Sequence, residues 1–451
     1  MRHTLFLLSL ALTLLVSFQS CIEDGLATSA SCQPAFSTDT LRLGTVWTGT
    51  PTPTYRFTVY NRHDKILNLS RVAFRDNSRD VFRLNVDGTA GSEITDIEIR
   101  PNDSVFVFIE ATIPETGLTR IETVTSHIDF LVNGVTSSLP VVASARDLRR
   151  MHAAVITSDT VFTPDYPIQV FDSLVVAPGA TLTLDPGTQL LFHDKAKMIV
   201  RGTLIAAGTP EHRIDMTGDR TGNVVASIPY DIMSGQWSGL SFASGSVHNR
   251  LDFTTVRNST EGTTLGSLAS LEMRGAVLRN ANGFPLSATG ASITAVGCEI
   301  AEGGDGVISL DGGTYRFDHC TVANHYLFSV FGGPAIQIGN VKGSGATAVE
   351  FSNSIIYGLG DELSPPDLTD TSIRFVRCLF GSSGSDDDHF VNCLWQADPL
   401  YLLDRSKYIF DYHLQQKSPA LGEAGPCEFV EIMSPDGVDI ERHIGAYGPA
   451  R

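Results

Sequence analysis

The sequence predicts an all-β protein in which a β-sandwich precedes a long parallel β-helix. Short runs of alternating apolar and polar residues, separated by turn residues, fill residues 35–147. A unit of roughly 22 residues then repeats along residues 150–425, as expected when a chain winds into stacked coils. The chain has 451 residues, 42% of them apolar, which is enough to bury more than one core.

Residues 35–147 contain three segments with the alternation of half-buried strands: 55–61, 105–111 and 128–132. Asn133 and Gly134 lie between two apolar runs, which indicates a tight hairpin. Several short strands joined by such turns favour an antiparallel sandwich. No catalytic constellation occurs in this part of the chain. We therefore expect a spacer or docking module, with ligand binding as the alternative.

The repeat is clearest in six segments, which start at Leu251, Leu271, Ile293, Tyr315, Val349 and Ile373. In each segment the first and third residues are apolar, as in a strand with one buried face. The third residues are Phe253, Met273, Ala295, Phe317, Phe351 and Phe375. A two-residue bend follows, and then a column of small residues formed by Val256, Ala276, Cys298, Cys320, Ser354 and Cys378. Two residues later the chain is apolar in all units but one, where Asn258 stands. Each unit is therefore predicted to hold a strand, a bend and a second strand.

Stacking of the coils explains why equivalent residues match. Coils about 4.8 Å apart place the same position of successive units in one column. Cys298, Cys320 and Cys378 are therefore expected to be buried small side chains rather than disulfide partners or metal ligands. Cys32, Cys393 and Cys427 lack the spacing of a zinc site, and the sequence leaves their pairing open. The long step from Tyr315 to Val349 predicts an insertion near residues 329–345.

The N-terminus has the layout of a signal peptide over residues 1–20, followed by Cys21. Its apolar run covers residues 5–16, which is too short to span a membrane, and no later run approaches the ~20 residues that a span needs. The residues that end in Ser20 and Cys21 resemble the lipobox of bacterial lipoproteins, except that Phe18 replaces the preferred Leu.

The lipobox resemblance implies cleavage before Cys21, acylation of Cys21 and a stable membrane anchor, with a linker over residues 21–34. The alternative is a secreted protein in which Cys21 forms a disulfide. Glu23 and Asp24 resemble the surface-export signal of Bacteroidetes lipoproteins. This resemblance implies a location at the cell surface, on the outer membrane.

The two regions of the chain also resemble known folds. Residues 35–147 resemble the immunoglobulin-like modules of bacterial surface proteins, and residues 155–425 resemble right-handed parallel β-helix, pectate-lyase-like repeats. The segments 412–420 and 444–447 resemble the ending of such proteins. We therefore expect residues 426–451 to form a C-terminal cap over the open end of the β-helix, where strand edges would otherwise be unpaired.

The pectate-lyase-like superfamily includes polysaccharide lyases and hydrolases, whose chemistry needs carboxylates near the scissile bond. Asp252, Glu272 and Glu350 are expected to share an outward column. Asp318 and His319 lie at a bend close to Arg316, and these three residues are the catalytic candidates if the chain is an enzyme. For all of these residues the sequence favours solvated surface, turn chemistry or a structural role over catalysis.

Other acidic residues lie in turns and loops. Asp305 and Asp311 stand beside glycines, which is typical of turn chemistry. The run Asp386, Asp387 and Asp388 is expected to be a solvated loop, with a calcium contact as the alternative.

The sequence favours a non-catalytic function, because no motif typical of the catalytic families is present. We expect a lipid-anchored surface protein whose β-helix binds an extracellular glycan or protein, without a cofactor or metal ion. The alternatives are a polysaccharide lyase or glycoside hydrolase, and a structural or adhesive envelope component. The net charge of −18 argues against a nucleic-acid partner.

Overall fold

The computed structural model describes residues 25–76, 80–225, 228–328, 333–339, 346–364, 372–429 and 432–450. These residues form strands, turns and two 3-10 helices, Tyr230–Ile232 and Arg405–Lys407, without an α-helix. The chain divides into two compact units between Asp147 and Leu148. The expected signal peptide and Cys21 lie outside the described residues.

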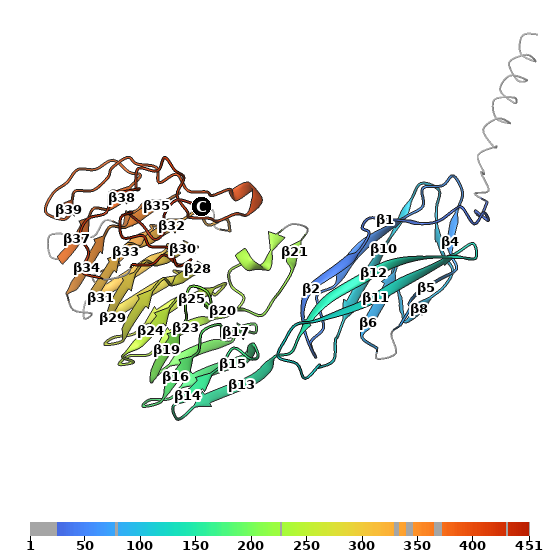
Figure 1. The fold of residues 1–451 in the computed structure, drawn as a ribbon, viewed down its shortest axis with the longest axis horizontal. Coiled ribbons are helices and arrows are strands. Elements are labelled where there is room, and N and C mark those ends of the chain that lie inside the picture. Colours follow the sequence, from blue (N-terminus) through green and yellow to red (C-terminus); the bar gives the residue numbers. More distant parts are fainter. Residues whose placement is uncertain are drawn as a thin grey trace, which may run out of the picture. The chain divides into compact units, whose positions relative to one another are not determined.

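The first unit consists of two five-stranded sheets that share one apolar core. One sheet has the order β1-β3-β10-β6-β7 and the other β2-β12-β11-β5-β8 (Figure 1). Their strands are β1 (Ala35–Phe36), β2 (Leu41–Trp47), β3 (Tyr55–Tyr60), β5 (Arg71–Phe74), β6 (Phe82–Val86), β7 (Thr89–Gly91), β8 (Glu93–Ile94), β10 (Ser104–Ala111), β11 (Glu122–Val132) and β12 (Val135–Arg146). A small sheet of β4 (Leu67–Leu69) and β9 (Ile97–Ile99) completes the unit. Phe57 from the first large sheet and Phe130 from the second meet in the core.

The predicted hairpin joins β11 and β12. Asn133 and Gly134 both have a positive φ, 51° and 78°, and Val132 pairs directly with Val135. Positive φ at both central residues is the conformation that a two-residue hairpin turn requires and that Asn-Gly adopts easily. The alternating segments predicted at 55–61, 105–111 and 128–132 lie in β3, β10 and β11.

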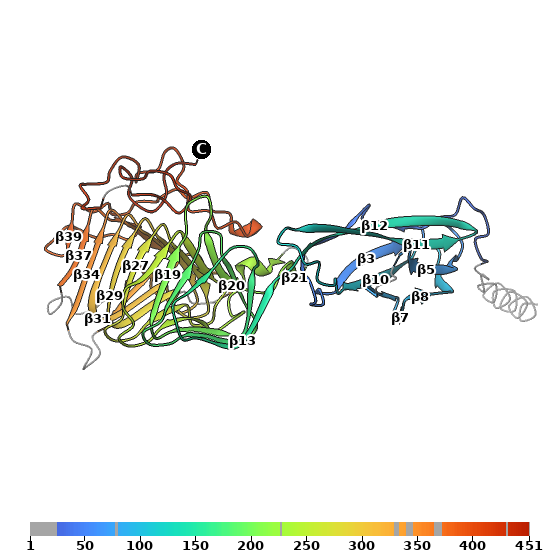
Figure 2. The ribbon, with the colours of Figure 1, turned by 60° about the horizontal axis from the view of Figure 1, so that its bottom comes forward.

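The second unit is one sheet of 25 strands whose pairs are all parallel. Each strand pairs with its equivalent one turn of chain further on, so that the chain winds in coils with three strand positions per coil, consistent with a β-helix (Figure 2). We call these three positions the first, second and third stack.

The first stack contains β18 (Lys197–Val200), β23 (Gly239–Phe242), β26 (Thr263–Leu265), the first halves of β29 (Leu286–Val296) and β31 (Ile308–Asp318), β33 (Ile336–Gly339) and β36 (Leu363–Ser364). The second stack contains β14 (Thr160–Phe162), β16 (Thr181–Leu184), β19 (Thr203–Ala207), β24 (Asn249–Asp252), β27 (Ser270–Arg274), the second halves of β29 and β31, β34 (Thr347–Ser352), β37 (Ser372–Val376) and β39 (Phe390–Val391).

The third stack contains β17 (Gln189–Phe192), β20 (Ile214–Gly218), β25 (Thr254–Arg257), β28 (Val277–Ala281), β30 (Glu299–Gly303), β32 (Thr321–Asn324), β35 (Ile355–Gly358) and β38 (Leu379–Phe380). The strands β13 (Arg149–Ile156) and β15 (Ile168–Val176) open the coils and bend across the third and first stacks. A short hairpin of β21 (Asn223–Val225) and β22 (Ile228–Pro229) leaves the coils after β20.

The predicted interior columns are confirmed from Met273 onwards. Phe317 pairs with Phe351 and Phe351 with Phe375, and all three side chains are fully buried. Their rings stack, with centroids 4.4 Å apart for Phe317 and Phe351 and 5.5 Å apart for Phe351 and Phe375. In-register pairing thus produces a ladder of identical side chains inside the coils.

The predicted register of the first segment is wrong by two residues. Leu251, not Phe253, pairs with Met273, and Phe253 lies at the bend with a φ of 42°. Because a shift of two residues keeps every side chain on the same face, the alternation pattern alone does not distinguish the two registers. Consequently Arg250 pairs with Glu272, so that Asp252 and Glu272 do not share a column.

The column of small residues is confirmed from Ala276 onwards, and it gains one member. Val256 does not belong to it, because Val256 pairs with Leu278, which places Thr254 next to Ala276. Cys298, Cys320 and Cys378 are fully buried, and all six described cysteines are free thiols. The hydrogen bond from Leu394 N to Cys378 O places Cys393 next in this column. The thiols of Cys320 and Cys378 donate to backbone carbonyls of the coil before, Ala295 and Phe351.

Residues 401–429 and 432–450, which we call the C-terminal segment, lie along the flank of the coils (Figure 1). This differs from the predicted cap over the open end. The outward side of the third stack is apolar at Ala301, Ala323, Ile355 and Leu379, and these residues form one cluster with Tyr412, Leu414, Ile444 and Tyr447. The physical reason for the flank position is therefore the burial of this outward apolar strip.

Phe351→Ala should destabilise the second unit by about 3–5 kcal/mol, because it leaves a cavity between two stacked rings. Phe328→Ala is the control, since Phe328 is 41% exposed, and it should cost less than about 0.5 kcal/mol. Calorimetric unfolding of both variants measures the difference. Equal stability of the two variants would contradict the buried ladder.

Candidate functional site

The three residues predicted as catalytic candidates lie near the end of β31, but they do not form one group. Arg316 projects outward, and its Nη2 is 2.8 Å from Glu428 Oε2 while its Nε is 3.7 Å from Glu350 Oε1. Asp318 and His319 are buried at the bend that follows the strand. The structure thus separates the solvent-facing Arg316 from the buried pair.

Asp318 and His319 form a short hydrogen bond between Oδ1 and Nδ1, at 2.6 Å. The other ring nitrogen, Nε2, lies 3.2 Å from the carbonyl oxygen of Glu441 in the C-terminal segment. A carbonyl oxygen can only accept, so Nε2 carries a proton and donates. With its side chain fully buried and both nitrogens engaged, His319 does not present a base to a polysaccharide outside the coils.

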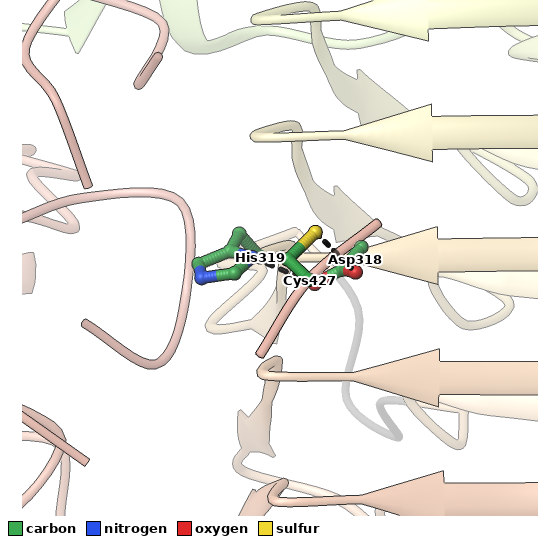
Figure 3. Close-up of side chains that lie close together, drawn as sticks. All are labelled: Asp318, His319 and Cys427. Carbon is green, nitrogen blue, oxygen red and sulfur yellow. Dashed lines mark hydrogen bonds and ion pairs between the residues drawn. The ribbon is translucent and has the colours of Figure 1, made fainter. Parts of the chain in front are cut away.

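Cys427 is the neighbour that the sequence analysis did not include in this site. Its thiol donates to Asp318 Oδ2 at 2.9 Å, so that Asp318 accepts from His319 and Cys427 through different oxygens. Figure 3 shows the three side chains gathered where β31 ends. Burial and then the hydrogen bond to Asp318 raise the pKa of Cys427 to about 12, so that the residue is a thiol at neutral pH.

Asn353 extends the cluster into the next coil. It occupies the same bend position as His319, and both residues have a left-handed backbone, with φ values of 47° and 49°. Its side-chain amide donates to Asp318 Oδ1 at 3.1 Å and accepts from the backbone N–H of Gly425 at 2.8 Å. The alignment of the repeats does place Asn353 above His319, whereas no sequence pattern points to Cys427 or Glu441.

A second polar cluster lies between the third stack and the C-terminal segment. Arg279 Nη1 is 3.3 Å from Glu299 Oε1, and Tyr447 donates to Glu299 Oε2 at 2.6 Å. Glu302 accepts a hydrogen bond from the Tyr412 hydroxyl. Burial raises the pKa of Glu302 to about 7, and its Oε2 has no hydrogen-bond partner among the described residues. These carboxylates are enclosed by the C-terminal segment and serve its attachment.

A pocket of about 310 Å³ opens at the edge of the second stack, beside the C-terminal segment. Its wall carries two guanidinium groups, Arg250 and Arg274, and two aromatic rings, Phe253 and Phe429. Asp252 also lines it and forms an ion pair with Arg250. The second oxygen of this carboxylate, Oδ1, is buried and accepts no hydrogen bond from the part of the chain that the structure describes. The pocket therefore combines aromatic side chains with cationic donors.

The acidic loop near residue 386 is engaged in turn formation. Asp386 accepts from the backbone N–H of Cys393 and from the indole N–H of Trp395, both at 3.2 Å. Asp387 accepts from the N–H groups of His389 and Phe390, and these bonds lower its pKa. These contacts are those of carboxylates that stabilise a turn.

Comparison with known proteins gives no family for this chain. No family model matches the sequence, and no curated protein matches it. Among the described residues, no helix is long and apolar enough to cross a membrane.

Glu302 should lower the stability of the second unit as the pH rises from about 4.5 to 7, against the opposite contribution of His325, whose pKa burial lowers to about 4. Burial raises the pKa of the Glu302 carboxyl to about 7, above the usual 4.5 of Glu. The contribution of Glu302 to the free energy of unfolding is therefore fully present below pH 4.5. It decreases by roughly 3 kcal/mol as the pH rises through 7.

Denaturant unfolding at a series of pH values measures this slope. The stability of Glu302→Gln relative to the wild type should therefore rise over this pH range, while Glu423→Gln, at an exposed position of the C-terminal segment, should follow the wild type. An identical slope in the wild type and Glu302→Gln would refute the assignment to Glu302.

Proposed function

We propose that this chain is a lipid-anchored surface protein whose second unit, a right-handed parallel β-helix, binds an extracellular glycan in the pocket beside Phe253 and Phe429. The pocket is the main support for this proposal, because it brings aromatic side chains and arginines to one outward site. Apolar walls with a few placed polar groups are typical of small-ligand sites.

Each group in the pocket matches a feature of a sugar. In this proposal the rings of Phe253 and Phe429, which line the pocket, pack against the C–H side of a pyranose. Asp252 forms an ion pair with Arg250 at the pocket wall. Arg274 is exposed, and its guanidinium group can donate two parallel hydrogen bonds to one carboxylate. This favours a glycan that contains uronic acid.

Anchoring through Cys21 would place this site outside the cell. The signal-peptide pattern, the lipobox-like residues and the acidic pair Glu23 and Asp24 support this location on the outer membrane. In this proposal the first unit is an immunoglobulin-like spacer, supported by its two sheets with a shared core. The contacts of Asp318 and His319 give no support to the lyase or hydrolase alternative, because the C-terminal segment covers the pair.

Titration of the full chain with a panel of neutral and uronate oligosaccharides tests the glycan site. Arg274→Ala and Phe429→Ala should each weaken binding by about tenfold or more, which corresponds to roughly 1.4 kcal/mol. Arg374→Ala is the matched control, since Arg374 is exposed on the same stack but outside the pocket, and it should bind like the wild type. No binding across the panel, or equal loss in all three variants, would refute the site.

Cys21→Ala should release the protein from the membrane fraction and abolish the incorporation of labelled fatty acid. Two or more acyl chains provide a stable anchor, and without the thiol no thioether can form. Cys32→Ala should keep both properties. A Cys21→Ala protein that still partitions with membranes would contradict the anchor.

A further inference from the structure

The cluster at the end of β31 contains three different metal-ligating groups. Asp318 offers a carboxylate, His319 an imidazole and Cys427 a thiol, and one ligand atom of each lies within 4.8 Å of the other two. Thiolate, imidazole and carboxylate are the ligands that Zn²⁺ takes in proteins. Two of the three come from one bend and the third from a segment more than a hundred residues away, so the fold itself assembles the set.

Each ligand also has the partner that a metal site needs around it. The carbonyl oxygen of Glu441 accepts a hydrogen bond from His319 Nε2, and this bond orients Nδ1 toward Asp318. Asn353 donates to Asp318 Oδ1, and the backbone N–H of Phe429 donates to Cys427 Sγ at 3.3 Å. Such outer contacts orient metal ligands and fix the tautomer of a ligating histidine.

The distances are close to those of a coordination sphere. Bonds of about 2.0–2.3 Å to Zn²⁺ place neighbouring ligand atoms roughly 3–4 Å apart. The hydrogen-bonded separations are 2.6 Å from Nδ1 to Oδ1 and 2.9 Å from Sγ to Oδ2, so the ligands need to open by up to about 1 Å. Cys427 is only partly buried, so the cluster borders solvent on the side of its thiol.

We propose that Asp318, His319 and Cys427 bind one divalent transition-metal ion of the Zn²⁺ class, which fastens the C-terminal segment to the coils. Binding forms a metal–sulfur, a metal–nitrogen and a metal–oxygen bond. The thiol proton of Cys427 and the proton shared by His319 Nδ1 and Asp318 Oδ1 leave to solvent. The site revises the expectation of a metal-free protein, and it is independent of whether the pocket binds a glycan.

Titration of the chelator-treated full chain with Co²⁺ tests this site, because Co²⁺ bound by a thiolate gives a charge-transfer band and tetrahedral Co²⁺ gives visible absorption. We expect one equivalent to saturate both signals. Zn²⁺ should displace the cobalt and raise the melting temperature of the wild type, since an ion that binds only the folded state stabilises it.

Two variants and one control make the result decisive. Cys427→Ser should abolish the charge-transfer band and the Zn²⁺-dependent rise in melting temperature, and Asp318→Asn should weaken Co²⁺ binding at least about tenfold. Cys32→Ala, in the other unit, should behave like the wild type. Circular dichroism establishes that each variant is folded. Absence of a charge-transfer band in the folded wild type, or an undiminished band in folded Cys427→Ser, would overturn the proposal.

Discussion

In-register pairing of parallel strands from one coil to the next is the constraint on which the second unit depends. It fixes the spacing of the coils and obliges equivalent side chains to stack. Inside the coils this produces the ladder of Phe317, Phe351 and Phe375 and the column of thiols. At the bend, the same pairing places His319 directly beside Asn353, and both side chains form hydrogen bonds with Asp318. The interior packing and the polar cluster therefore have the same geometric origin.

The stacked columns are the part of the fold that the sequence predicts well. From Met273 onwards the repeated pattern assigns interior positions correctly, because burial of one face leaves a strict alternation that residue types must follow. The same alternation cannot fix the register at Leu251, since Phe253 satisfies it equally well two residues later. A bend with a positive φ at Phe253, a residue that rarely adopts this conformation, was the missing signal.

The candidate sites were predictable only where they follow from the repeat. Asp318 and His319 stand out as a polar pair at a bend, and Asn353 follows from the alignment. Cys427 and Glu441 reach the site through the C-terminal segment, which has no repeat to place it. The buried Glu299 occupies an outward position that would be ordinary solvated surface in a bare coil, and only the overlying Tyr447 makes it an interior residue.

The C-terminal segment also sets the order in which the chain can complete its fold. The contact between Arg213 and the carbonyl of Pro435 joins residues 222 positions apart, so it forms after the intervening coils exist. Coils can add one upon another as the polypeptide emerges, whereas the apolar strip at Ala301, Ala323 and Ile355 stays uncovered until the C-terminal segment arrives. A polypeptide that lacked the C-terminal segment would therefore expose a continuous apolar strip along one flank of its coils, and such exposed surface promotes aggregation.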